Sequence, residues 1–282
     1  MMNSVNEVTV IGVDCATDSS RVGLALGKWR SGHRLAIEDV RIGAEPDPVT
    51  IICEWLQATP EPALIAIDAP FGWPAPLSDG LNDHRAGSKL SGKPNDLFRR
   101  DTDRAIQRRI GITPLDVGAD RIARTAHAAL ALLGIVRDST RREVPLAWSH
   151  HGLEGTSAIE VYPAATLRAS GLPYRGYKKV DQEPARRQIL VALNPALSFG
   201  ANRLRIESAA AENADLLDAI ICMVAARDFL DGRAIPPSDL DVTQREGWIW
   251  VRDPEIPTTP TALCHRRNAM SPSIHRDEKC GR

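Results

Sequence analysis

The sequence predicts an α/β fold with one mixed sheet, in which three antiparallel strands are followed by parallel strands, flanking helices and a helical insertion. Residues 8–14, 21–28 and 34–42 are rich in β-branched and aliphatic side chains and are separated by polar or glycine-containing connections, which is typical of successive antiparallel strands. Residues 63–68 form a continuous apolar run behind a helical segment, as expected of a buried parallel strand after a crossover helix. Residues 158–162 predict the last core strand, which ends before a proline.

Helices are predicted where apolar residues recur at helical spacing. The first spans residues 48–59, because such residues recur from Ile51 to Leu56 and Pro60 follows. Residues 70–76 contain three prolines and break regular structure. A loop is expected over residues 78–94, further helices over 95–110, 116–135, 164–170, 182–193 and 207–231, and a short strand or packing segment over 247–251.

The chain is expected to form one domain with a tail. Residues 1–253 are predicted to be the folded domain, with the helical insertion at about 78–156. Residues 254–282 are rich in Pro, Thr, Ser and mixed charge, and we expect them to be disordered.

The composition excludes several protein classes. No apolar run approaches the roughly 20 residues of a membrane span, and the N-terminus lacks a basic segment followed by an apolar one, so neither a membrane partner nor a signal peptide is expected. The five cysteines are scattered without a Cys-x-x-Cys pair, which argues against a zinc ribbon or disulfide framework and favours a reducing, cytoplasmic location. Homodimerisation is left open.

Positive charge is concentrated in the predicted insertion. Residues 85–142 contain 13 Lys plus Arg against 6 Asp, a local charge of +7, whereas the whole chain carries −1. A basic block beside an acidic set suits an enzyme that acts on a phosphate polymer, because one part holds the backbone and the other holds metal ions. The alternative is a solvated helical insertion whose charges only keep it soluble.

Acids at the ends of apolar runs and on the last helix indicate a metal site. A buried charge costs free energy unless it is paired or bound to metal, and carboxylates are ligands that Mg²⁺ prefers. We expect Asp14, Asp68 and Asp218 to be metal ligands, with Asp215 one helical turn from Asp218 as a possible fourth. Glu160 is a further catalytic candidate, since strand alternation turns it away from its apolar neighbours. The alternatives are a solvent-facing Glu160, a surface Asp218, and an Asp215 that only favours its helix N-terminus.

Two groups of basic residues are candidates for nucleic-acid binding. Arg100, Arg104 and Arg108 recur every fourth residue and would form a stripe on one helix face. Lys178 and Lys179 follow two tyrosines, and tyrosine with lysine can stack on and neutralise a nucleic-acid strand. A salt-bridged helix face and an ordinary polar loop are the respective alternatives.

The predicted order β-β-β-α-β, followed by helices, a further strand and a long final helix, is the layout of an RNase H-like domain. Six motifs carry a resemblance to the DUF429 family, whose members are predicted to be RNase H-fold nucleases. They are Val-Ile-Gly-Val-Asp-x-Ala (10–16), Ile-Asp-Ala-Pro-Phe-Gly-Trp-Pro (67–74), Phe-Arg-Arg-x-x-Asp-Arg (98–104), Glu-Val-Tyr-Pro (160–163), Tyr-Lys-Lys (177–179) and Asp-Leu-Leu-Asp-Ala (215–219). The resemblance spans about residues 8–251, supports a role for Glu160, and implies nuclease activity.

The leading hypothesis is a metal-dependent nuclease in which carboxylate-bound Mg²⁺ or Mn²⁺ activates water against a phosphodiester, with DNA and RNA both open as substrates. A second hypothesis is an ATP-dependent phosphotransferase of the actin and sugar-kinase type, because residues 14–20 resemble its first phosphate loop. Against it, the sequence shows no second β-β-β-α-β half. The third is a non-catalytic module that binds nucleic acid or another partner.

Overall fold

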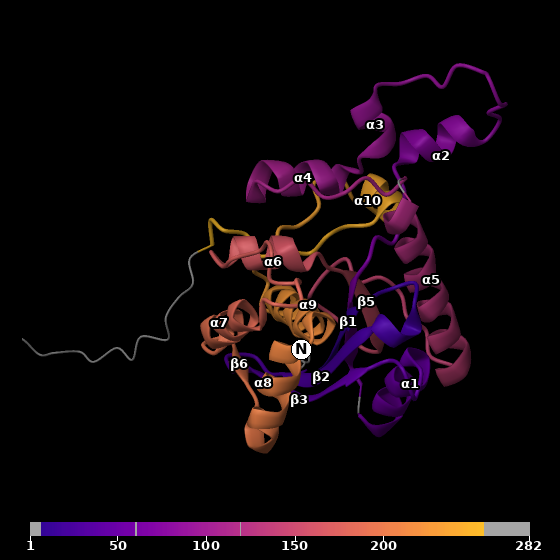
Figure 1. The fold of residues 1–282 in the computed structure, drawn as a ribbon. Helices are drawn as coiled ribbons and strands as arrows, with labels where there is room; N and C mark the ends of the chain where they lie inside the picture. The colour runs from indigo at the N-terminus through magenta and orange to yellow at the C-terminus, as the bar shows by residue number, and fades with distance from the viewer. Residues whose placement is uncertain (1–6, 60, 119, 257–282) are drawn as a thin grey trace, which may run out of the picture.

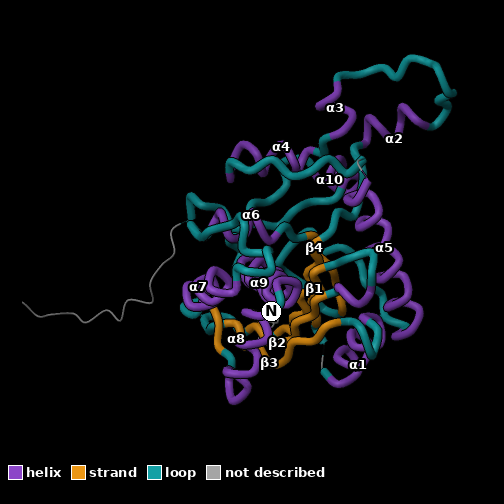
Figure 2. Tube along the Cα trace, viewed as in Figure 1, coloured by secondary structure: helices purple, strands orange, loops and turns teal. Residues whose placement is uncertain are grey.

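A six-stranded mixed sheet with helices on both faces forms the centre of the molecule (Figures 1 and 2). The computed structural model describes residues 7–59, 61–118 and 120–256. The strand order is β5-β4-β1-β2-β3-β6; β1, β2 and β3 are antiparallel neighbours, and β4 and β5 run parallel to β1. This arrangement confirms the predicted α/β class. The strands are β1 Val8–Asp14, β2 Gly23–Trp29, β3 Leu35–Ile42, β4 Ala63–Asp68, β5 Thr156–Glu160 and the two-residue β6 Leu197–Ser198, which the sequence analysis missed.

Two apolar cores lie on the two faces of this sheet. One face is covered by α1 (Pro48–Ala58) and α5 (Asp120–Thr140), which pack on Ile11 of β1. The other face is covered by α9 (Ala214–Leu230), which packs on the neighbouring residue Val10. Because successive strand residues point to opposite faces, a strand that is apolar at both positions must be covered twice. The remaining helices of the second face are α6 Pro163–Ala169, α7 Glu183–Leu193 and α8 Arg203–Glu212.

Helix α9 approaches the sheet through glycine. A Cβ added at Gly12 of β1 would lie 2.0 Å from the carbonyl oxygen of Ala219, and one at Gly23 of β2 would lie 2.1 Å from the carbonyl oxygen of Asp215. Neither approach leaves room for a side chain, so both positions require glycine for close packing of backbone on backbone. The depth at which α9 lies against β1 and β2 is therefore fixed by these two residues.

The helical insertion lies between β4 and β5. Helices α2 (Ala75–Leu81) and α3 (Pro94–Phe98), with the loop between them, extend from the body, whereas α4 (Asp101–Ile110) packs beside α10 (Leu240–Glu246) (Figure 1). The single helix predicted over 95–110 is two helices, because Arg99 and Arg100 have extended backbone conformations. The loop predicted over 78–94 begins inside α2, and the helix predicted over 116–135 is α5.

The long helix predicted over 207–231 is also interrupted. Asn213 has an extended conformation between α8 and α9, and its side chain accepts hydrogen bonds from the backbone N–H groups of Asp215 and Leu216. Such an N-cap stabilises the start of a new helix. In the predicted packing segment, Trp248 and Trp250 are buried, and Ile249 forms an isolated bridge to Glu160.

The predicted tail falls mostly on residues 257–282, which lie outside the described residues. The division of the chain at residue 253 stays a prediction. Among the helices that the structure describes, none has both the length and the apolar character needed to cross a lipid bilayer.

Candidate metal centre

Three aspartates from distant parts of the sequence converge beyond one edge of the sheet. Asp14 and Asp68 end the parallel neighbours β1 and β4, and they are paired in register. Asp218 comes from the second turn of α9, which lies against both strands. One carboxylate oxygen from each of the three lies within 4.8 Å of the others. The predicted convergence of these three acids is therefore present in the fold.

The local sequence explains why these three side chains meet. Parallel strands carry their last residues to the same edge of a sheet, which places Asp14 beside Asp68. The cap at Asn213 fixes where α9 begins, and Gly12 lets it approach β1. Asp218 is then fully buried on the side of α9 that faces the strand ends, whereas Asp14 is 8% exposed.

Burial and repulsion from neighbouring carboxylates raise the pKa values of all three carboxyl groups. Desolvation is the main cause at Asp14, whose pKa lies well above its usual range, and the charge of Asp218 adds to it. Desolvation also raises the pKa of Asp68 to about 7, even though the charge of Lys178 acts in the opposite direction. Desolvation is also the main cause of the raised pKa of Asp218. At neutral pH, three negative charges in this space are unfavourable without a cation.

Two neighbouring residues already bind Asp218. The Tyr177 hydroxyl donates a hydrogen bond of 2.7 Å to Asp218 Oδ1, and Lys178 Nζ forms an ion pair with Asp218 Oδ2. Desolvation and the charge of Asp218 raise the pKa of Tyr177, so the phenol remains a donor. Desolvation alone would lower the pKa of Lys178, but the charges of Asp218, Asp68 and Asp14 outweigh it and keep the ammonium protonated. Both lysine side chains are exposed to solvent, but only the ammonium of Lys178 is paired with Asp218 in the acidic cluster.

The donor set fits a hard divalent cation. All three converging ligand atoms are carboxylate oxygens, which suit Mg²⁺, Mn²⁺ or Ca²⁺ better than they suit softer metals. Three carboxylates face one ammonium group, so a negative charge excess remains that a divalent ion would neutralise. The cluster can therefore hold a metal ion.

Asp215 is outside this cluster. It occupies the first turn of α9, where its backbone N–H donates to the Asn213 side chain. Its charge nevertheless contributes to the raised pKa of Asp14, so the two carboxyl groups are near each other. A role for Asp215 as a ligand stays a prediction.

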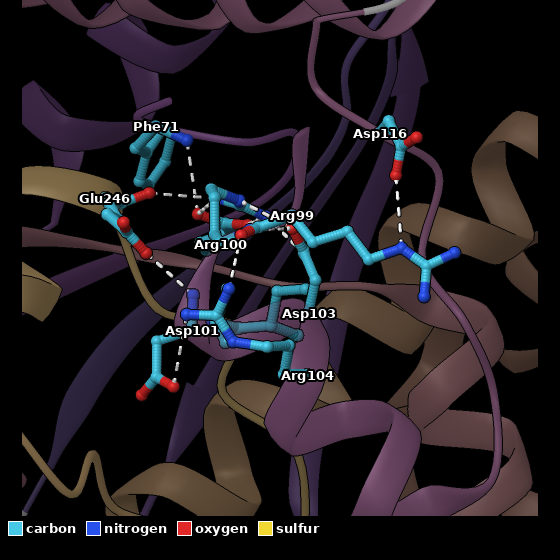
Figure 3. A network of polar contacts seen from close by, with 11 residues as sticks. Phe71, Arg99, Arg100, Asp101, Asp103, Arg104, Asp116 and Glu246 are labelled. Carbon is cyan, nitrogen blue, oxygen red and sulfur yellow. Dashed lines mark hydrogen bonds and ion pairs between the residues drawn. The ribbon is translucent and has the colours of Figure 1, made fainter. Parts of the chain in front are cut away.

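Glu160 belongs to a separate buried network around Arg100. Figure 3 shows this network, with Phe71, Arg100, Asp103 and Glu246 labelled. Arg100 donates from Nη2 to Glu160 Oε1 at 2.7 Å and from Nη1 to Oε2 at 2.9 Å, and the backbone N–H of Phe71 also donates to Oε2. The remaining Arg100 donors bind Asp103 and the carbonyl oxygen of Glu246. The predictions that Glu160 faces solvent or acts among the catalytic acids are not met, because Arg100 and Phe71 occupy both of its oxygens.

The predicted arginine stripe is also not present as one exposed surface. All five N–H donors of the Arg100 guanidinium are used inside the protein, and its side chain is only 2% exposed. Its predicted role in nucleic-acid binding is therefore wrong. Arg104 is half-buried and donates to the carbonyl oxygen of Arg99 (Figure 3), whereas Arg108 is exposed. The helix does not present three free cations, because its first residues are anchored to the core.

The structure adds residues that sequence reasoning passed over. Tyr162 and Leu115 border cavities beside Asp68, and the carboxylate of Glu246 accepts from the backbone N–H groups of Ala75 and Asp101. Tyr162 could have been found, since it lies in the Glu-Val-Tyr-Pro motif. Nothing in the local sequence marks Leu115 or Glu246.

The comparisons with known proteins agree with the motifs. A family model described as a protein of unknown function (DUF429) matches residues 12–241, which is more than half of the chain. The chain belongs to the DUF429 family. No curated protein and no solved structure gives a significant match. The three converging aspartates all lie within the DUF429 match, so the candidate metal centre is part of the region that defines membership.

Proposed function

We propose that this protein is a metal-dependent phosphodiester hydrolase that acts on nucleic acid, with Mg²⁺ or Mn²⁺ held by Asp14, Asp68 and Asp218. The observation that carries the proposal is the meeting of these three acids, with oxygens within 4.8 Å, against a single lysine. The basic insertion, with its local charge of +7, supports a polyanionic substrate.

The cation and the protein residues would contribute different parts of the reaction. A bound divalent ion supplies Lewis-acid stabilisation of phosphoryl oxygens and lowers the pKa of water. In the net reaction the oxygen of water bonds to phosphorus, one P–O ester bond breaks, and the leaving oxygen receives a proton. Tyr177 holds Asp218 in orientation through its hydrogen bond, and Lys178 provides a positive charge beside the acids for a phosphate oxygen.

Two observations disfavour the phosphotransferase alternative. The described residues form a single six-stranded sheet, without a second half of the kind that encloses ATP in actin-like kinases. In the segment that resembles a phosphate loop, the Asp18 carboxylate binds the backbone N–H and hydroxyl of Ser20, so this segment makes an aspartate-capped turn that would repel a phosphate. These features favour the hydrolase.

Calorimetric titration with Mn²⁺ tests the metal site. We expect the wild type to bind Mn²⁺ and to hydrolyse bis(4-nitrophenyl) phosphate, and the Asp14→Asn/Asp68→Asn variant to lose at least a hundredfold in both, because two of the three ligands become neutral. Asp138→Asn, which changes an exposed acid on α5, is the matched control and should behave like wild type. Equal titrations for the three proteins would remove the proposal. Metal binding without hydrolysis of any diester would leave only a non-catalytic binding module.

A further inference from the structure

Two cavities meet at Asp68, one of the three converging acids, and together they indicate the substrate that the proposed hydrolase would take. One has a volume of about 410 Å³ and the other about 230 Å³. Asp68, Tyr162 and Lys178 line both of them. A molecule that fills both cavities would therefore pass beside Asp68 and Lys178.

The larger cavity is aromatic and basic. The chain contains three tyrosines, and all three, Tyr162, Tyr174 and Tyr177, line this cavity together with Lys178 and Lys179. The guanidinium groups of two arginines, Arg168 and Arg175, lie 5.5 and 5.1 Å from the centre of the Tyr174 ring. Aromatic walls beside cations suit a base that stacks and a phosphate backbone that is neutralised.

The smaller cavity is mainly apolar. Its walls include Pro70, Pro114, Leu115, Ile122 and Ile249, and Leu115 is 69% exposed. Its volume is below the roughly 300–1,000 Å³ of drug-sized ligand pockets, so it suits a group of one ring system. The Arg100–Glu160 pair also borders it, but the donors of this arginine are all used inside the protein. The cavity therefore offers apolar contact more than hydrogen-bond readout.

The junction places a diester linkage between these two cavities. Asp68 is both a candidate metal ligand and a wall of each cavity, and the adjacent ammonium of Lys178 can approach a phosphate oxygen. A phosphodiester that joins two nucleosides would have one nucleoside on each side. In a duplex, neighbouring bases are stacked and paired, so entry into separate cavities would require unpairing and unstacking, which costs a few kcal/mol per nucleotide.

We propose that the substrate is single-stranded nucleic acid, whose two nucleosides flanking the scissile phosphodiester separate into these two cavities. This inference rests on the proposed function. One base occupies the apolar cavity beside Leu115, and the other lies among the tyrosines, with Lys179 facing the continuing backbone. Because stacking and apolar contact dominate over hydrogen-bond readout, cleavage has little sequence preference.

Strand selectivity is the first test. With Mn²⁺, we expect kcat/KM for a single-stranded oligonucleotide to exceed that for the same sequence in a duplex by at least about tenfold, since unpairing is needed in the duplex. DNA and RNA versions of the strand are assayed in parallel, together with bis(4-nitrophenyl) phosphate as a diester without bases. Equal cleavage of single strand and duplex would overturn the inference.

Substitutions of two exposed residues test the role of the cavities, and exposed positions are not expected to destabilise the fold. We expect Leu115→Ser and Lys179→Ala each to reduce kcat/KM for the oligonucleotide by about tenfold more than for bis(4-nitrophenyl) phosphate. Leu204→Ser, at a leucine that is 83% exposed on α8, and Arg34→Ala, at an exposed cation just before β3 and outside the basic insertion, are the matched controls and should stay within about twofold of wild type on both substrates.

The outcomes separate this inference from the proposed function. No Mn²⁺ binding and no hydrolysis of the small diester would overturn both. Hydrolysis of the small diester, with equal losses on both substrates in Leu115→Ser and Lys179→Ala, would overturn the two-cavity inference alone. Turnover of ATP in preference to every oligonucleotide would also overturn it.

Discussion

Two groups of buried acids lie beside each other at one edge of the sheet, and their surroundings make them different. Glu160 and Asp103 share four of the five N–H donors of Arg100, so both carboxylates are paired with a buried cation within the protein. Within the described part of the chain, Asp14, Asp68 and Asp218 have one lysine against them, Lys178. We call the first group the closed network and the second the open cluster. A buried acid at a strand end is thus a metal ligand candidate only where the protein supplies too little positive charge.

The largest expected effect is a loss of folding stability when the closed network is disrupted. Arg100→Ala would leave two buried carboxylates without their cationic partner, so we expect the free energy of unfolding to fall by about 3–5 kcal/mol. Urea unfolding measures this, with Arg108→Ala, an exposed arginine of the same helix, as the control within about 0.5 kcal/mol of wild type. A small loss in Arg100→Ala would show that the network does not hold the insertion to the core.

Gly247→Ala tests how tightly the closed network is packed. Gly247 has a φ of +85°, and an added Cβ would lie 2.7 Å from Glu160 Oε2. We expect a loss of about 2 kcal/mol, because backbone strain and a clash with the carboxylate add together. Gly32→Ala is the matched control, since Gly32 has a φ of +74° with nothing near its Cβ. Equal losses in the two variants would mean that the contact with Glu160 costs nothing.

A substitution in the open cluster should raise the free energy of unfolding, whereas a substitution in the closed network should lower it. Because the pKa of Asp68 is raised to about 7 in the folded protein from 3.8, its contribution to stability is present below pH 3.8 and is lost as the pH rises through 7. In a chelator at pH 8, Asp68→Asn should therefore be more stable than wild type, by about 1–2 kcal/mol after allowance for solvent screening.

Thermal or urea unfolding between pH 4 and pH 8 measures this difference. Addition of Mn²⁺ should reverse it, since only the wild type retains all three ligands. A wild type that stays more stable than Asp68→Asn at pH 8 in chelator would show that its carboxylate is already neutralised.

The smallest expected effect is on Mn²⁺ binding, in a variant of Asp215, which lies just outside the open cluster. Asp215 contributes charge near Asp14 but lies outside the three converging oxygens. We expect Asp215→Asn to weaken Mn²⁺ binding by less than about threefold, as a charge at a distance does in a partly solvated site. A loss as large as that of Asp14→Asn in calorimetry would make Asp215 a direct ligand instead.

The sequence was sufficient to predict five of the six strands and the convergence of the open cluster. Apolar runs of strand length end at Asp14 and Asp68, and the predicted topology makes their strands neighbours, as the register confirms. Asp218 was favoured over Asp215 from its motif, and only Asp218 joins the cluster. These features depend on local patterns and on one topological rule, so they could be derived without coordinates.

The closed network could not be predicted from the sequence. Strand alternation does turn Glu160 away from its apolar neighbours, but the insertion and the 247–251 segment cover that side, so it is buried. Its partner Arg100 is 60 residues earlier in the chain, and no periodicity encodes a pairing between separate elements. The helix break at Asn213 could have been predicted more readily, because asparagine is a favoured N-cap.

Residues 14, 68 and 218 together span most of the chain, and α9 must be in place against β1 before the last of these acids joins the other two. A nascent chain in which α9 has not yet formed consequently offers only two of the three carboxylates. Under the proposed function, a divalent ion would gain its third ligand only once α9 has packed on β1, and the ion would then stabilise the sheet and the helix together.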